Sequence, residues 1–369
     1  MRNNPVAPGV LWPDRRSEDA PLLLQLYRFP QTHLLVAVPS VFLVAFALGL
    51  ATDTSALATL ILPVTVVMIF ATMVGLPLRE LVELRSVKRL LVVAVALNFV
   101  WIPVLATGIG LSLLADHPAL FAGLALIALL PTSGMTIAWT GIQRANVAAA
   151  VKLTASGLLL GAVATPWYLM VMVGEFIPID LAAVFRTIVV VVFVPLALSQ
   201  ITTRIILART TRAHLQTHIK PLLTPLSVWG LLYLVFVTTS SRAEMIVDDL
   251  ALLLLAVVAV VAFYAINFLV STLVAVRFFP RDDGIALVNS TVLRNLSIAI
   301  GIAATQFSGE AALLITVAFM LQNQSIAYYA RAAERRWFRM EADPSEGPEQ
   351  AGDADGPNLR RTADTTEQP

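Results

Sequence analysis

The chain has no cysteine among its 369 residues, so it forms no disulfide, no thiolate metal site and no cysteine nucleophile. Histidine is also scarce, with four residues, and none pairs with a carboxylate at the spacing typical of metal ligands. Charged residues make up only 13% of the sequence, whereas soluble domains carry about 25%. The formal net charge of +1 gives no overall field that would attract nucleic acid, and no nucleic-acid partner is expected.

Hydrophobic residues account for 58% of the sequence, and the mean hydropathy is +0.80, which is typical of an integral membrane protein. A helix that crosses the hydrocarbon core of a bilayer needs about 20 apolar residues. This criterion predicts an all-α membrane protein with ten transmembrane helices, at roughly 32–51, 56–77, 88–113, 119–142, 147–172, 181–203, 221–240, 247–278, 284–306 and 309–333.

The basic residues alternate between the predicted loops, which indicates the orientation of the helices. One set of loops and their flanks carries nineteen Lys and Arg residues, and the other set carries only Arg186 and Arg242. Cytoplasmic loops are enriched in Lys and Arg. We therefore expect a multi-pass protein of the cell membrane with both termini in the cytoplasm.

The predicted transporter domain covers residues 32–333 and follows a polar cytoplasmic segment at 1–31. Two repeats of five helices, at 32–172 and 181–333, divide this domain. Because five is an odd number, the second repeat must be inverted in the membrane. Residues 341–369 are rich in Asp, Glu, Gly and Pro, which predicts a disordered cytoplasmic tail.

Two predicted helices are interrupted at equivalent places of the two repeats. In the fourth helix the interruption is LLPTSGMT (129–136), where Pro131 removes a backbone donor. In the ninth helix Asn289, Ser290 and Thr291 compete for backbone hydrogen bonds within an apolar stretch. Broken helices at corresponding positions point to a transporter's binding site, so these two are expected to cross beside a shared cavity.

Positive charge deep in the membrane is the main functional signal of the sequence. No Asp or Glu lies deep in a predicted helix, whereas Arg294 and Lys152 do. Arg294 is too deep to snorkel easily, and a central Arg costs about 2.5–3.5 kcal/mol to insert. A guanidinium suits carboxylates and oxyanions, so we expect an anionic solute. The alternative is a structural Arg294, bonded to carbonyls of the broken helices.

The candidate substrate-binding residues share a place on the two interruptions: Arg294, Asn295, Asn289, Ser290, Thr132 and Ser133. The alternative role for the neutral members of this set is to satisfy backbone groups that the breaks expose. Lys152 either snorkels or, if it is buried, is a candidate proton carrier.

Four stretches carry a family resemblance: PTSGMTIAWTGIQRANVAAAV (131–151), ALNFVWIPVLA (96–106), RNLSIAIGIA (294–303) and LQNQS (321–325). They resemble the fourth to fifth helices, the third helix, the second crossover and the polar patch of the tenth helix in the bile acid/sodium symporter superfamily, which includes the arsenical-resistance permeases. The resemblance covers most of residues 32–333. It implies ten helices divided into a panel domain (helices 1, 2, 6 and 7) and a core domain (helices 3, 4, 5, 8, 9 and 10). It also implies an ion-coupled carrier, commonly of organic anions.

The resemblance implies ion-coupling residues as well. Thr136 and Thr154 stand at hydroxyl positions that hold sodium in the family, and Asn98 stands at an amide position of the third helix. With Lys152 as the possible proton carrier, the candidate ion-coupling residues are Thr136, Thr154, Asn98 and Lys152.

Four positions depart from the family's sodium ligands. Ile137 stands in place of an Asn, Ala150 in place of a Ser, Ser290 in place of a carboxylate and Arg294 in place of an amide. A fixed cation about 4 Å from Na⁺ would repel it by about 4 kcal/mol at an effective dielectric constant of about 20. These departures argue against two-sodium coupling and leave H⁺, a counter-anion or a single residual Na⁺ at the two threonines.

The predicted function is ion-coupled secondary active transport of a small organic anion or oxyanion by alternating access. The predicted partners are this solute and the lipid membrane, with a monomer or homodimer as the assembly and no cofactor beyond a coupling ion such as Na⁺ or H⁺. Efflux of arsenite or another metalloid is the first alternative, although the missing cysteine leaves arsenite without a thiol partner. A non-transporting membrane sensor has no evident output domain. An intramembrane enzyme would need paired carboxylates, a Ser–His pair or a His-rich cluster that the predicted helices lack.

Overall fold

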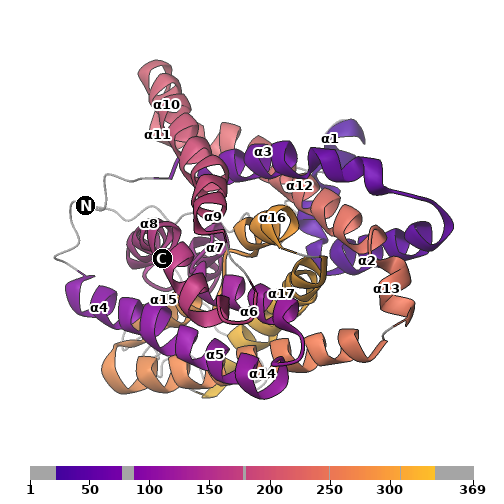
Figure 1. Ribbon diagram of the computed structural model, residues 1–369. Helices are drawn as coiled ribbons and strands as arrows, with labels where there is room; N and C mark the ends of the chain where they lie inside the picture. Colours follow the sequence, from indigo (N-terminus) through magenta and orange to yellow (C-terminus); the bar gives the residue numbers. More distant parts are fainter. Residues whose placement is uncertain (1–21, 77–86, 178–179, 249, 308, 337–369) are drawn as a thin grey trace, which may run out of the picture.

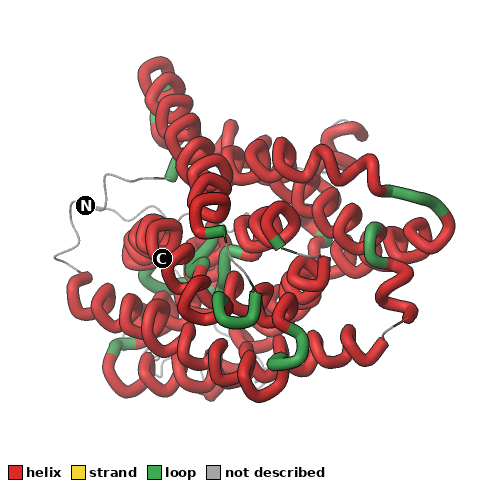
Figure 2. Tube along the Cα trace, in the orientation of Figure 1, coloured by secondary structure: helices red, strands yellow, loops and turns green. Residues whose placement is uncertain are grey.

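The computed structural model describes residues 22–76, 87–177, 180–248, 250–307 and 309–336. The predicted tail at 341–369 and most of the predicted segment at 1–31 lie outside them. The described part consists of helices and connecting loops, without a strand (Figure 2). In chain order its helices are α1 (Leu22–Thr32), α2 (Leu34–Ala51), α3 (Ile61–Met73), α4 (Lys88–Ala96), α5 (Ile102–Leu113), α6 (Pro118–Leu129), α7 (Gly134–Ile142), α8 (Val147–Val173), α9 (Leu181–Ile188), α10 (Val194–Arg209), α11 (Arg212–His214), α12 (Lys220–Ser240), α13 (Ala243–Asp248), α14 (Leu250–Phe278), α15 (Arg281–Val292), α16 (Leu296–Gln306) and α17 (Gly309–Arg336).

Eight helical segments are long and apolar enough to cross a membrane, or up to ten if each of two bent pairs counts as one span. The bent pairs are Leu22–Thr32 with Val36–Ala51, and Pro118–Leu129 with Gly134–Ile142. The ten predicted ranges overlap these eight segments and two pairs. The all-α membrane architecture is therefore confirmed, while the inverted repeat and the panel and core domains stay predictions.

Two helical extensions were not predicted from the sequence. Helix α10 continues past residue 203 to Arg209, and α11 with α12 begins well before residue 221; the pair α10 and α11 projects beyond the other helices in Figure 1. The apolar criterion stopped at Arg204, but a helix outside the hydrocarbon core needs no apolar residues. Helix α1, within the predicted polar segment, is held by the hydroxyl of Tyr27, which donates to the carbonyl of Leu222 at 2.7 Å.

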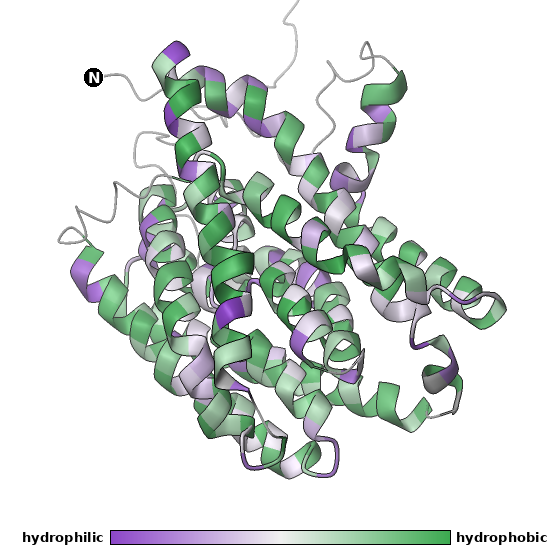
Figure 3. Ribbon diagram, turned by 45° about the horizontal axis from the view of Figure 1, so that its top comes forward, coloured by the Kyte–Doolittle hydropathy of each residue, from purple (hydrophilic) through white to green (hydrophobic). Residues whose placement is uncertain are grey.

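Hydrophobic residues, green in Figure 3, make up most of the helices, and many of their large side chains are exposed. Large examples include Leu43 at 64% exposure, Trp167 at 55%, Val171 at 82% and Leu269 at 59%. A soluble monomer rarely exposes so much contiguous apolar surface. These side chains are suited to contact lipid tails.

Helix packing sets the position of the two interrupted segments. Helix α12 packs against α2 and α3. Helix α14 packs against α15 and α17, and α17 packs against α6 and α16; α16 also contacts α3 and α9. Two glycines allow close approaches between helices near these segments. A Cβ on Gly123 would lie 2.7 Å from the carbonyl oxygen of Ala311, and one on Gly301 would overlap the side chain of Thr65.

Three π-helical turns, at Leu97–Trp101, Val189–Phe193 and Leu215–Ile219, each lie just before a proline. Proline has no N–H and displaces the carbonyl four residues earlier, so the preceding turn widens. Pro103 frees the carbonyl of Phe99 in this way, and the hydroxyl of Tyr168 donates to that carbonyl at 2.6 Å. The first π-helical turn also contains Asn98, one of the candidate ion-coupling residues.

Candidate functional site

The first interruption separates α6 from α7 and follows from three residues. Pro131 disfavours helical geometry at Leu130, whose φ and ψ are −105° and 79°. Thr132 has a φ of 58°, in the left-handed region that a β-branched residue rarely adopts. Ser133 then caps α7, because its side chain accepts from the backbone N–H of Met135 at 3.3 Å. The two helices are bent by 58° at this break.

The second interruption separates α15 from α16 without a proline or glycine. Asn295 caps α16 by accepting from the N–H of Ile298 at 3.3 Å. Gln322 of α17 satisfies the backbone of Arg294: its Oε1 accepts from the N–H at 2.8 Å, and its Nε2 donates to the carbonyl at 3.4 Å. The predicted break is therefore present, and its exposed backbone groups are bonded to a distant side chain.

The two interruptions contact one another, at a place that we call the crossing. The N–H of Asn295 in the second break donates to the carbonyl of Leu130 in the first at 2.9 Å. Beside this bond, the hydroxyl of Thr136 on α7 donates to the carbonyl of Asn289 on α15 at 3.4 Å. Both half-helix N-termini, at α7 and α16, begin within a few residues of the crossing.

Arg294 lies at the centre of the crossing and is only 1% exposed. Its Nε donates to the carbonyl of Ile127 at 2.9 Å, its Nη2 to that of Ala128, and its Nη1 to that of Thr291 at 3.2 Å and to Oδ1 of Asn98. All four acceptors are uncharged oxygens. In this conformation the guanidinium is bonded to carbonyls of the broken helices, and its direct contact with a solute stays a prediction.

The helix geometry explains why these carbonyls need a donor. The helical partner of the Ile127 carbonyl would be the N–H of residue 131, which is a proline. The carbonyls of Ile127 and Ala128 end α6, and that of Thr291 lies at the end of α15. A helix C-terminus carries a partial negative charge, so one guanidinium is favourably placed between two such ends.

Hydroxyl and amide groups surround the crossing on the α8 side. Thr132 donates through its hydroxyl to the carbonyl of Thr154 on α8 at 3.2 Å. The hydroxyl oxygen of Thr154 and Oδ1 of Asn289 are buried and have no hydrogen-bond partner among the described residues. Buried polar atoms almost always have a partner, so each of these two oxygens is a candidate ligand atom.

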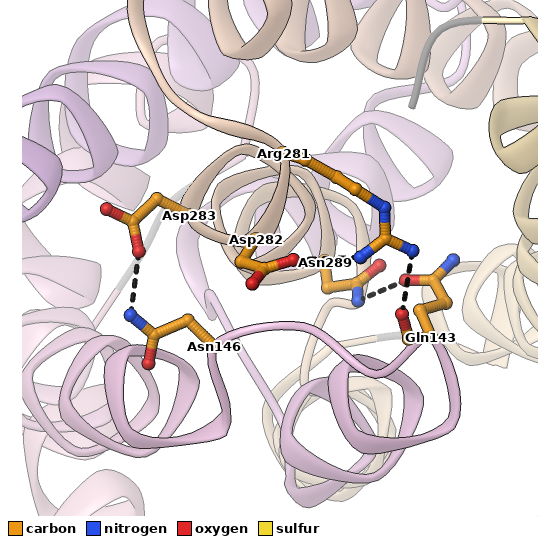
Figure 4. Close-up of polar contacts among 6 residues, drawn as sticks. All are labelled: Gln143, Asn146, Arg281, Asp282, Asp283 and Asn289. Atoms are coloured by element: carbon orange, nitrogen blue, oxygen red, sulfur yellow. Dashed lines mark hydrogen bonds and ion pairs between the residues drawn. The ribbon is translucent and has the colours of Figure 1, made fainter. Parts of the chain in front are cut away.

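A second set of contacts joins the turn between α7 and α8 to the start of α15 (Figure 4). Nδ2 of Asn289 donates to Oε1 of Gln143 at 2.9 Å, and Nδ2 of Asn146 donates to Oδ1 of Asp283 at 2.7 Å. Arg281 forms an ion pair with Asp282 at 2.8 Å and donates to the carbonyl of Gln143 at 3.1 Å. The interrupted helices are therefore fastened to one another beyond the crossing itself.

Sequence reasoning missed the contribution of α14. Nδ2 of Asn267 donates to the carbonyl of Thr291 at 2.9 Å, Ser271 bonds to both Asn267 and Thr291, and the hydroxyl of Tyr264 donates to Oε1 of Gln322 at 2.8 Å. Residues 264, 267 and 271 lie three and four apart, on one face of a long apolar helix. That spacing was the available signal for a polar face directed at the crossing.

The structure brings nine of the ten candidate residues to the crossing. Ser290 is fully buried there, and its hydroxyl donates to the carbonyl of Leu287 at 2.8 Å. Lys152 is buried on α8 at 8% exposure, but helical periodicity places it on a different face from Thr154. The described residues contain no group of three or more His, Cys, Asp or Glu side chains that could hold a metal ion.

A comparison with known protein families gives a match. A family model described as "Sodium Bile acid symporter family" matches residues 62–249, about half of the chain. This range contains the first interruption and α8 but ends before the second interruption. No curated protein matches the chain.

Proposed function

The chain belongs to the sodium bile acid symporter family, and from this premise we propose that it is an ion-coupled secondary active transporter of a small anionic solute. In the proposal the solute binds at the crossing of the two interruptions. Alternating access then follows from movement of one group of helices against the other. The cell membrane and cytoplasmic termini, expected from the basic loops, are part of the proposal.

The observation that carries the anionic solute is the meeting of two half-helix N-termini beside open space. Helix N-termini present unpaired N–H groups and a partial positive charge, which favour anions. Ser133 and Asn295, the two capping residues, are half-buried rather than fully buried. Gly134, the first residue of α7, is exposed, and a Cβ added to it would meet no atom within 4 Å.

The charge of Arg294 supports the same conclusion. No Asp or Glu is buried among the residues whose side-chain exposure the structure describes, and no carboxylate contacts the guanidinium there. An anion about 8 Å from the guanidinium would gain about 2 kcal/mol at an effective dielectric constant of about 20. In this proposal Arg294 attracts the solute by its charge while it holds the crossing through its hydrogen bonds.

We propose a single Na⁺ or a proton as the coupling ion. The unpartnered oxygens of Thr154 and Asn289, with the hydroxyl of Thr136 nearby on α7, are the type of ligand that Na⁺ takes. Ser290 supplies no carboxylate, and Arg294 occupies the side of the crossing nearest α6, so a second Na⁺ has no favourable place. The alternative coupling ion is a proton carried by the buried Lys152.

The test uses purified protein and proteoliposomes. A thermal-shift screen of organic anions, oxyanions and arsenite, with and without Na⁺ and across pH, is expected to find stabilising anions, because a ligand that binds only the folded state stabilises it. Uptake of a stabilising anion is then measured in vesicles. Stabilisation by arsenite alone would instead favour metalloid efflux, and the absence of any solute flux would contradict transport.

A matched pair of variants tests the site. Gly134→Leu is expected to abolish transport without unfolding the protein, because its side chain would enter the open space at the start of α7. Gly108→Leu makes the same change at another exposed glycine that has no atom within 4 Å, on α5, and is expected to leave transport intact. Equal transport by the two variants would place the solute elsewhere.

A further inference from the structure

A groove of about 510 Å³ lies away from the crossing, between α3, the start of α9 and the end of α16. Its lining includes Leu62, Asp180, Arg186, Thr187 and Gln306. Helix α16, whose N-terminus lies at the crossing, ends at this groove with Gln306. The groove is within the range of about 300–1,000 Å³ that is typical of small-molecule sites.

One face of α9 forms the polar wall of the groove. Ala183, Arg186, Thr187 and Val190 all line it and are spaced as residues on one helix face are. Ala182 and Ala183 leave space for a ligand because their side chains are small. The sequence had singled out Arg186 as one of only two basic residues in the loops and flanks assigned to the outer side of the membrane.

The groove holds one acid and one base that do not neutralise one another. The ion pair between Arg281 and Asp282 is the one salt bridge within 4.0 Å in the described part of the chain, so Asp180 and Arg186 are not so joined. Asp180 instead caps α9, because its Oδ1 accepts from the N–H of Ala183 at 3.0 Å. The guanidinium of Arg186 is therefore available to an external anion.

We propose that this groove is an outer-side subsite for the anionic solute, in which Arg186 binds a carboxylate or another anionic group. The proposal rests on the proposed transport function. Thr187 and Gln306 offer hydrogen bonds to a hydroxyl or carbonyl on the same solute, and Asp180 lies at the other end of the wall. The groove volume of about 510 Å³ suits small organic anions. Gln306 lies at the end of α16, so the same helix connects the subsite to the crossing.

The anionic group could come from a dissolved solute or from a phospholipid headgroup, because Arg186 suits both. We assign the groove to a solute because its lining carries an amide, a hydroxyl and a carboxylate besides the arginine.

The cysteine-free chain makes accessibility directly measurable, because any introduced cysteine is the only thiol. Ala183→Cys places a thiol in the groove. Val189→Cys places one outside its lining, among the exposed apolar side chains that are suited to contact lipid tails and are closed to a water-soluble reagent. In proteoliposomes, a membrane-impermeant maleimide is expected to label Ala183→Cys but not Val189→Cys. Benzoate is expected to slow the labelling of Ala183→Cys at least about fivefold, and benzamide, its neutral counterpart, is not.

The role of Arg186 is tested with charge variants in the Ala183→Cys background. Arg186→Gln is expected to abolish protection by benzoate, and Arg186→Lys to retain part of it. In the transport assay, Arg186→Gln is expected to raise KM about tenfold with little change in kcat. Equal protection by benzoate and benzamide, no protection by either, or protection that survives Arg186→Gln would each overturn the subsite.

Further outcomes distinguish the solute subsite from a lipid site and from the proposed transport function. Labelling that falls when phosphatidylglycerol replaces phosphatidylcholine, with no effect of benzoate, would show a lipid site and overturn the proposal. Protection by benzoate requires no transport, so a subsite found in a protein without flux would contradict the proposed function alone. Flux with an unchanged KM in Arg186→Gln would contradict the subsite alone.

Discussion

Replacing Arg294 with methionine should destabilise the fold, because one guanidinium satisfies several buried oxygens. The change leaves the carbonyls of Ile127 and Ala128 and Oδ1 of Asn98 without the donors described above, while the carbonyl of Thr291 keeps a second donor. Each buried unsatisfied group costs about 1–3 kcal/mol, and relief from burying the charge offsets several kcal/mol. We expect a net loss of about 2–5 kcal/mol in the free energy of unfolding.

The assay is a thermal melt followed by tryptophan fluorescence, since the chain has six tryptophans and no thiol for a reactive dye. A loss of this size is expected to lower the melting temperature by roughly 5–10 °C. Arg209→Met is the control. Arg209 is exposed at the end of α10, so its loss should change the free energy of unfolding by less than about 1 kcal/mol.

A double-mutant cycle tests the physical reason. Pro131→Ala restores an N–H at the position where the helix would supply a donor to the carbonyl of Ile127. Arg294→Met is therefore expected to cost about 1 kcal/mol less in the Pro131→Ala background than in the native one. An unchanged melting temperature for Arg294→Met would refute the structural role of the guanidinium, and equal losses in both backgrounds would refute the role of the proline.

Three further predictions concern single groups. Thr154→Val should leave the melting temperature unchanged within about 2 °C in Na⁺-free buffer, because the Thr154 hydroxyl has no partner among the described residues. The same variant should lose any stabilisation by Na⁺. If Na⁺ still raises its melting temperature, this oxygen is not a Na⁺ ligand. Tyr168→Phe leaves the carbonyl of Phe99 without the tyrosine's hydrogen bond and should cost about 1–2 kcal/mol in a thermal melt, whereas native stability would mean that water replaces the hydroxyl. Gly301→Val should cost about 1–3 kcal/mol by forcing α16 away from the side chain of Thr65 on α3, and a native melting temperature would show that this contact yields easily.

The helices and both interruptions could be predicted because their causes are local. Pro131 affects the conformation of its own neighbours, and Asn289 to Asn295 concentrate polar groups in one apolar stretch. Apolar run length likewise predicted the membrane helices. The same criterion failed at α10, since nothing in hydrophobicity says where a helix ends once it leaves the hydrocarbon core.

Two of the four partners of Arg294 could not be predicted, because they are backbone oxygens of apolar residues. Ile127 and Ala128 carry no polar side chain, and their carbonyls become acceptors only where α6 stops beside a segment more than 160 residues away in sequence. The sequence did leave open a structural role for the arginine, and the structure supplies its geometry. The polar face of α14 is different: its spacing of three and four residues was readable and was overlooked.

The positive charge at the crossing is the guanidinium of Arg294, which is covalently part of the chain. It therefore holds the two interruptions together under conditions that would remove a bound metal ion. A metal ion in the same cage would escape on dilution, and chelators or a change of medium would strip it. A side chain has no dissociation equilibrium with the surroundings. The contact between the two interruptions should therefore stay assembled during purification in salt-free detergent.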